Sequence, residues 1–180
     1  MSEVKGIESK YVTKASNGNI YIQNARVYSG SKNNQTGRVL VDTGTGTRKV
    51  ILKNLRVSSR NSTSTNQSTN SVLSIKTRKN TKVIIKNSKV HASKVTLSSS
   101  TNHAKNCVGV LCIQSDKNSK VLISNTNVSA RGSSMSLTTG GNAKKSCTGV
   151  LCIQTDESSI DIRNLDVSSL GINDFSTIKR

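Results

Sequence analysis

The chain has 180 residues, enough for one domain, and a net charge of +18 from 27 Lys and Arg against 9 Asp and Glu. Ser, Thr and Asn number 30, 18 and 19, whereas the aromatic residues are three Tyr and one Phe. Such a composition is common in disordered chains, but the Val, Ile and Leu residues form tight clusters, which indicates folded β-structure. No apolar run approaches the ~18 residues of a membrane span, and the first residues show no signal-peptide pattern.

In chain order, five predicted strands share the template apolar-x-apolar-x-Asn-x-x-apolar. The copies cover residues 20–27, 50–57, 83–90, 121–128 and 160–167, with Asn24, Asn54, Asn87, Asn125 and Asn164 at the common position. A second apolar strand lies between successive copies, at residues 39–41, 72–75, 110–113 and 150–153. A recurrence of 30 to 39 residues predicts a solenoid with one coil for each copy.

The recurring Asn has a physical explanation in a stack of coils, where equivalent residues lie about 4.8 Å apart. We expect each of these side chains to point inward at a corner and to bond the Asn above and below. Asn also tolerates the left-handed backbone that a sharp corner requires. The alternating aliphatic residues would fill a thin core, which explains the shortage of aromatic rings.

This pattern resembles the right-handed parallel β-helix (pectin-lyase-like) superfamily, with the five Asn as its asparagine ladder. The resemblance implies an all-β fold, a right-handed parallel β-helix of about five coils that forms one domain over residues 1–180. We expect coils at residues 17–167, an N-terminal cap at 1–16 and a C-terminal cap at 168–180. A second interpretation of the acidic C-terminal segment is contact with the basic flank of a neighbouring subunit. Such folds include lyases, hydrolases, phage spikes and inert structural proteins, so the resemblance does not define a function.

The positive charge follows the repeat. Residues 1–155 contain 24 basic and 4 acidic residues, whereas residues 156–180 contain 3 and 5. Basic residues at equivalent template positions would form rows on one face, and these are Arg26, Lys49, Lys53, Arg56, Lys82, Lys86, Lys89 and Lys120. The face is either a solvated surface or a site for a polyanion, such as a nucleic acid backbone or an acidic glycan. Aromatic residues do not interleave with the basic ones, so contact with nucleic acid would be to phosphate.

The four cysteines form two copies of one motif, Cys107-Val-Gly-Val-Leu-Cys112 and Cys147-Thr-Gly-Val-Leu-Cys152. Stacking would place Cys107 near Cys147 and Cys112 near Cys152, with α-carbons close enough for a disulfide but with β-carbons farther apart than such a bond prefers. A five-residue separation in a straight strand sends the two side chains to opposite faces, which disfavours a metal site. We therefore expect a buried, reduced ladder without metal or cofactor, either in an intracellular reducing compartment or in a virion.

The strands that carry these cysteines are apolar on both faces. If Val110 and Cys112 point inward, an aliphatic stripe points outward, made of Leu40, Leu73, Leu111, Ile113, Leu151 and Ile153. An outward stripe of this size is seldom left in water. Either the long loops cover it or another protein subunit does, and we favour the protein contact.

Catalysis has one candidate, the pair Asp116 and Asp156, which occupy equivalent positions. Two carboxylates about 5 Å apart suit retaining glycoside hydrolysis or could help to bind Ca²⁺. The alternative is two turn acids that meet solvent or the nearby Lys117. His91 and His103 lack partners at catalytic spacing, so we expect a non-enzymatic protein.

The sequence thus favours a structural or assembly protein that contacts protein subunits, as a virion component (capsid, minor capsid or tail). This choice of context rests on the structural members of the superfamily. The alternatives are a polyanion-binding module and, third, a polysaccharide-active enzyme.

Overall fold

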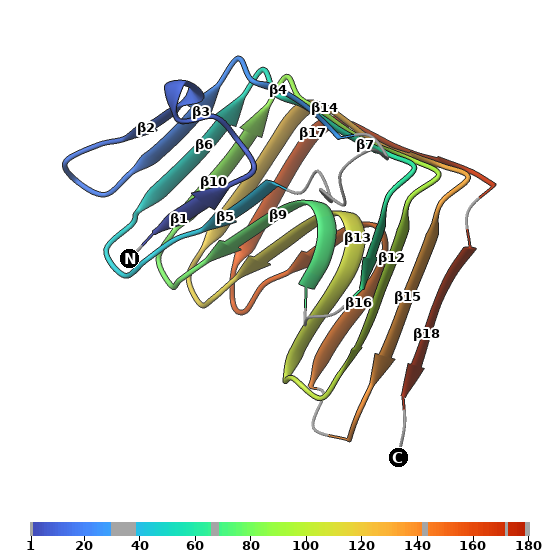
Figure 1. Ribbon diagram of the computed structural model, residues 1–180. Helices are drawn as coiled ribbons and strands as arrows, with labels where there is room; N and C mark the ends of the chain where they lie inside the picture. Colours follow the sequence, from blue (N-terminus) through green and yellow to red (C-terminus); the bar gives the residue numbers. More distant parts are fainter. Residues whose placement is uncertain (1, 30–38, 66–68, 142–143, 172, 179–180) are drawn as a thin grey trace.

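The computed structural model describes residues 2–29, 39–65, 69–141, 144–171 and 173–178. The chain is all-β and winds into a β-solenoid of about three turns (Figure 1). Three successive runs of strands pass through all three sheets, and these are β6–β9, β10–β13 and β14–β16. Strands β3–β5 precede these turns, and β17 and β18 follow them.

The largest sheet has nine strands and carries all five template copies. Their order is β2-β3-β6-β10-β14-β11-β7-β4, with β17 paired to β14. β14 and β17 run unbroken through a corner at which each earlier template copy divides into two strands. The strands are β2 (Val12–Lys14), β3 (Ile20–Gln23), β4 (Arg26–Ser29), β6 (Lys49–Lys53), β7 (Arg56–Arg60), β10 (Lys82–Lys86), β11 (Lys89–Ser93), β14 (Lys120–Arg131) and β17 (Ser159–Leu170).

Two smaller sheets complete the wall of the tube. The five-stranded sheet has the order β1-β5-β9-β13-β16, and the four-stranded sheet has the order β18-β15-β12-β8. The first contains β1 (Glu3–Lys5), β5 (Val39–Asp42), β9 (Thr69–Thr77), β13 (Lys105–Ser115) and β16 (Lys145–Gln154). The second contains β8 (Thr63–Thr65), β12 (Thr96–Thr101), β15 (Ser134–Thr139) and β18 (Asn173–Ile178), and a short 3-10 helix, η1 (Ser9–Tyr11), precedes β2.

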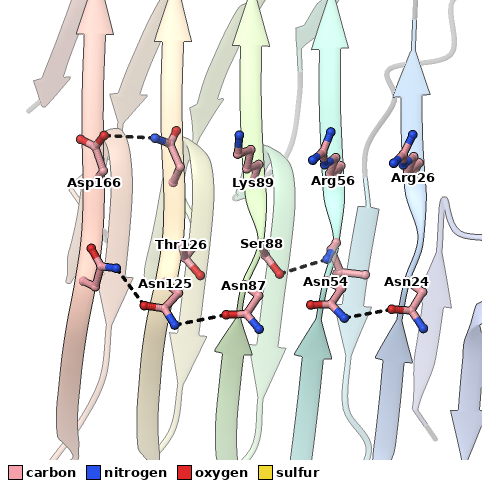
Figure 2. Close-up of a pocket in the computed structure, with 13 residues that line it drawn as sticks. Asn24, Arg26, Asn54, Arg56, Asn87, Ser88, Lys89, Asn125, Thr126 and Asp166 are labelled. Atoms are coloured by element: carbon pink, nitrogen blue, oxygen red, sulfur yellow. Dashed lines mark hydrogen bonds between the residues drawn. The ribbon is translucent and has the colours of Figure 1, made fainter.

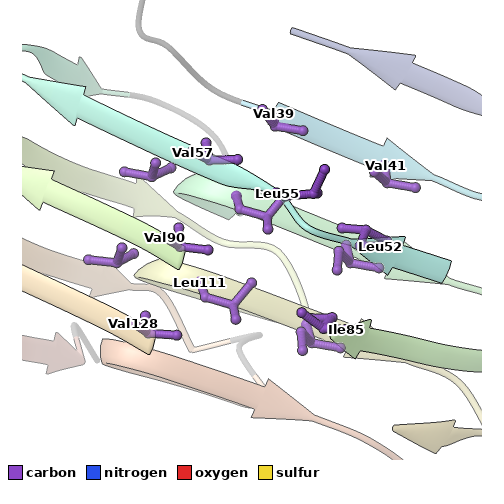
Figure 3. Packing of buried hydrophobic residues seen from close by; sticks show 14 of the residues in the cluster. Val39, Val41, Leu52, Leu55, Val57, Ile85, Val90, Leu111 and Val128 are labelled. Atoms are coloured by element: carbon purple, nitrogen blue, oxygen red, sulfur yellow. The ribbon is translucent and has the colours of Figure 1, made fainter. Parts of the chain in front are cut away.

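The core is a narrow stack of aliphatic side chains inside the tube (Figure 3). In β10, Val83 and Ile85 are fully buried while the residues between and beside them are partly or fully exposed. Parallel pairing repeats this alternation from coil to coil, because Val83 lies beside Val50 and Val121. Small β-branched residues fill such a stack without strain, so the fold needs few aromatic rings.

The two ends of the solenoid differ. At the N-terminal end, β1 pairs antiparallel with β5, and β2 pairs antiparallel with β3. Val4, Ile7, Tyr11 and Val12 of this segment pack against the core. The segment therefore lies across the first coil and interrupts the parallel order of the stack.

The C-terminal segment does not form the cap that we expected over residues 168–180. β17 continues in register with β14 as far as Leu170, and β18 adds to β15 in parallel. The described part of this segment therefore extends the solenoid and does not cover its end. The expectation failed because residues 168–170 and 173–178 satisfy the same backbone pairing as the earlier coils.

Candidate interaction surfaces

The five template asparagines form a column along the corner of the nine-stranded sheet (Figure 2). All five have a left-handed backbone, with φ between 47° and 59°, a conformation that Asn adopts more readily than most residues. The Nδ2 groups of Asn54, Asn125 and Asn164 donate to the Oδ1 atoms of Asn24, Asn87 and Asn125, at 3.0, 3.3 and 2.8 Å. Between Asn54 and Asn87 the bond runs one residue further along, from the Leu55 backbone N–H to Ser88 Oγ at 3.1 Å.

The expectation that these asparagines point inward is wrong, because all five are exposed. The left-handed residue turns its own side chain outward and directs the next residue into the tube. That next residue is buried in the inner coils, as Leu55, Ser88 and Thr126 show. The column therefore lines a surface groove and does not pin the interior.

A groove of about 640 Å³ follows this column. One of its walls is a row in which Arg26, Arg56 and Lys89 lie side by side on β4, β7 and β11. The row continues through Asn127 to Asp166, and Asn127 Nδ2 donates to Asp166 Oδ2 at 3.1 Å. The groove is thus basic over the first coils and acidic at β17.

The other predicted basic residues lie on the same sheet, in two rows. Lys49, Lys82 and Lys120 are paired neighbours in one row, and Lys53 and Lys86 are neighbours in the other. Between these rows runs a half-buried apolar row, made of Tyr21, Ile51, Ile84 and Leu122. The structure therefore brings all eight basic residues to one sheet, and sequence reasoning missed the apolar row between them.

The predicted outward aliphatic stripe is absent from the described residues. Leu73, Leu111 and Ile113 are fully buried in the main core. Leu151 and Ile153 are partly buried and pack against the same core from β16, the last described strand of its sheet. Leu40 is the exception among the six, because it lies in the row of Ser74 and Cys112, which alternates with the row of Leu73 and Leu111.

Two errors are involved. Leu73, Leu111, Ile113, Leu151 and Ile153 share one face as expected, but that face is turned toward the core. Leu40 differs in register, because the structure aligns Val39 with Leu73 and Leu40 with Ser74. A shift of one residue exchanges the two faces of a strand. The six residues therefore offer no continuous contact surface.

The cysteines form disulfides within each coil and not a reduced ladder. Cys107 bonds Cys112 with Cα atoms 6.3 Å apart, and Cys147 bonds Cys152 with Cα atoms 6.0 Å apart. The predicted stacking of Cys107 on Cys147 and of Cys112 on Cys152 is nevertheless present in the pairing of β13 with β16.

The disulfides form because the strand is not straight. β13 pairs with β16 as far as Gly109 and again from Leu111, but Val110 between them has no paired residue in β16. The strand therefore bends at Val110. An ideal Cβ on Gly109 would clash with the carbonyl oxygen of Gly149, which shows how closely the coils approach at the bend. The bend brings two side chains to the same face that a straight strand would place on opposite faces. The expectation of a reducing compartment loses this support.

The candidate catalytic carboxylates each pair with a lysine. Lys105 Nζ contacts Asp116 Oδ1 at 2.9 Å, and Lys145 makes the equivalent contact with Asp156. His91 Nδ1 bonds Ser129 Oγ at 2.7 Å, and the backbone oxygen of His103 accepts a bond from Asn106. No cluster of His, Cys, Asp and Glu suited to a metal ion occurs among the described residues.

The most exposed group of aliphatic side chains lies on β17 at the C-terminal end. Ile160, Ile162, Val167 and Leu170 are 46, 46, 45 and 64% exposed. Ile160, Ile162 and Val167 occupy the positions that Val121, Ile123 and Val128 fill with buried side chains one coil earlier. Among the described strands, β17 pairs only with β14, so its other edge carries unpaired backbone groups.

Sequence reasoning missed this open end. The aliphatic residues at 160, 162 and 167 match the buried positions of the other template copies, so the pattern alone predicts them to be buried. Within the described ranges, no helix is long and apolar enough to cross a membrane.

Comparisons with protein-family models, with curated proteins and with solved structures found no match.

Proposed function

We propose that this chain is a non-catalytic structural protein that assembles through the C-terminal end of its solenoid. One observation carries the proposal, which is the concentration of exposed aliphatic side chains on β17 beside an unpaired strand edge. Exposed edges and contiguous apolar patches are the features through which β-proteins add further chains. The lysine partners of Asp116 and Asp156 also favour a structural role, because each carboxylate is engaged in an ion pair.

The architecture that we propose for this role is a right-handed β-helix of five coils, counted with the incomplete first and last ones. Five strand segments in parallel register support the coil count. Right-handed crossovers between parallel strands are by far the commoner kind, which supports the handedness. The bonds between Asn side chains support their assignment as an asparagine ladder like that of the pectin-lyase-like superfamily.

The context that we propose is a virion, with the chain as a capsid, minor capsid or tail component. The two disulfides support a setting in which disulfides persist, and virion surfaces are among these settings. The choice of a virion among these settings comes from the structural members of the superfamily that the sequence resembles.

Assembly is tested by the mass of the particle in solution, measured by light scattering after size exclusion in high salt. We expect an oligomer, since apolar burial is not screened by salt. The variant Ile162→Lys should be monomeric, and Ile51→Lys, which changes a half-buried outward residue of β6, is the matched control. A monomeric wild-type chain at every concentration would refute the proposal.

A second candidate function is the binding of a polyanion along the groove. The observation that favours it is the row of Arg26, Arg56 and Lys89, which faces a column of exposed amides with no acidic residue before β17. Like charges about 4.8 Å apart repel one another, and an anionic polymer would relieve that repulsion.

Heparin chromatography tests this second function. The double variant Lys53→Glu/Lys86→Glu should elute at much lower salt than the wild type, because two exposed cations beside the groove become anions. Its oligomeric state should not change. Unaltered retention would exclude binding on this face, whatever the outcome of the assembly experiment.

A further inference from the structure

The C-terminal end has the chemistry of a self-complementary interface. We propose that two copies of the chain pair tail to tail through β17, antiparallel about a two-fold axis at Ile162, so that Asp161 of one copy faces Arg163 of the other. This inference rests on the proposed function, assembly through that end, and adds the partner and the register. In Figure 1, β17 and β18 are the outermost strands of their sheets at this end.

The backbone of β17 provides the first part of the argument. Its twelve residues, Ser159–Leu170, pair with β14 along one edge only, among the described strands. The other edge carries the donors and acceptors that a further strand would satisfy. Ile160 and Ile162, which continue the core positions of the coil before, would be covered by the same event.

Charge identifies the partner as a second copy. Residues 1–155 carry 24 basic and 4 acidic residues, whereas residues 156–180 carry 3 and 5. Two copies that approach through their basic faces repel each other, and the C-terminal segments are the part of the chain that escapes this repulsion. The exposed residues of β17 include both signs, with Asp161 and Asp166 against Arg163.

The N-terminal end does not offer an equivalent surface. There β1 and β2 lie antiparallel to the coil strands that they pair with, and their segment packs on the core. A head-to-tail contact would have to displace this segment, whereas a tail-to-tail contact uses two identical open ends. A contact of this isologous kind closes at two copies.

The register follows from side-chain direction and charge. Directly opposed residues of antiparallel strands point to the same face, so an axis at Ile162 keeps Ile162 of both copies inward and Asp161 and Arg163 of both copies outward. An axis at Ile162 opposes Asp161 to Arg163 of the second copy, twice by symmetry. An axis at Asp161 or at Arg163 would instead oppose two like charges.

The two charged side chains are already poised for this exchange. Within one chain, Arg163 Nη2 lies 3.3 Å from Asp161 Oδ2, and both side chains are at least half exposed. They occupy the outward positions that alternate with Ile160 and Ile162 along the strand. The pairing across the two-fold axis replaces a contact within each chain by two contacts between chains.

A charge-exchange experiment tests the pairing, with dimerisation measured by analytical ultracentrifugation at low salt. Asp161→Arg alone and Arg163→Asp alone should each weaken the dimer by roughly tenfold or more, because two opposed pairs become like-charged. An equimolar mixture of these two variants should form a heterodimer of wild-type strength. The combined variant Asp161→Arg/Arg163→Asp should also dimerise like the wild type.

The matched control is Lys86→Asp, which changes the charge by the same amount in the row of Arg163 but two coils away from the end. It should leave the dimer unchanged. If Ile162→Lys abolishes the oligomer but mixing the charge variants restores nothing, the antiparallel register is wrong and the assembly function stands. If the wild-type chain is monomeric, both the assembly function and the antiparallel pairing are refuted.

Discussion

The contribution of the Asn column to stability can be measured at Asn125, whose side chain is bonded to an Asn on each side. Its Nδ2 group donates to Asn87 and its Oδ1 atom accepts from Asn164, and its φ is 47°. The variant Asn125→Ala should lose both bonds and should also place an alanine in the left-handed region. We expect a cost of about 1–2 kcal/mol for the backbone and about 1 kcal/mol in total for two exposed hydrogen bonds.

A control separates the two parts. Asn118 has nearly the same backbone, with φ 57°, but belongs to an exposed turn and makes no side-chain hydrogen bond with the described residues. Asn118→Ala should therefore cost only the backbone part, about 1–2 kcal/mol. Asn125→Asp, which keeps the acceptor and tolerates the left-handed region, should cost roughly 0.5 kcal/mol through the lost donor.

The assay is urea unfolding followed by far-ultraviolet circular dichroism, since the chain has no Trp to report by fluorescence. The free energies of unfolding are compared between variants that have the same slope of free energy against urea concentration. An equal slope indicates that the variants expose the same surface on unfolding. If Asn125→Ala and Asn118→Ala lose the same free energy, the bonds between the column side chains do not stabilise the fold. The reasoning that connects the column to the stability of the stack would then be refuted.

Three further predictions concern the core and the bend. Gly109→Ala should destabilise the fold by roughly 1–3 kcal/mol in thermal or urea unfolding, because its new Cβ meets a backbone oxygen, whereas Gly141→Ala, which meets nothing within 4 Å, should be neutral. On stepwise reduction, the disulfide of the half-buried Cys147 should open before that of the fully buried Cys107. Alkylation and mass spectrometry measure the order, and the reverse order would contradict the burial of the two sites. Leu111→Ala should lower the free energy of unfolding by about 2–5 kcal/mol without changing the oligomer, because Leu111 is buried in the core. If the variant instead lost assembly and kept its stability, Leu111 would point outward into a contact surface.

The template predicted the main strands well because it combines two independent signals. Alternating aliphatic residues specify which face of a strand is buried, and the Asn specifies where the chain turns. Asn87, for example, ends β10 and precedes β11 with the left-handed φ of 53° that its residue type favours. The direction of its side chain could not be predicted from the same signals, because both an inward and an outward Asn can stack.

The second strand of each coil was harder to interpret because its two faces are both apolar. Residues 110–113 contain four apolar residues in succession, so alternation gives no register. Only the stacking of Val39 on Leu73 and of Leu73 on Leu111 decides which residues face the core. The disulfides depend in turn on the bend at Val110, a tertiary feature with no local signature besides the preceding Gly109.

The contrast between the two ends determines what kind of particle the open end would form. If both ends were open, parallel coils of one copy would stack on those of the next, and such a contact would grow into a filament. β1 and β2 prevent this growth, because they reverse the strand direction at the N-terminal end and pack on the core there. A chain with one closed and one open end forms pairs, so the concentration dependence of the particle mass should level off at twice the monomer.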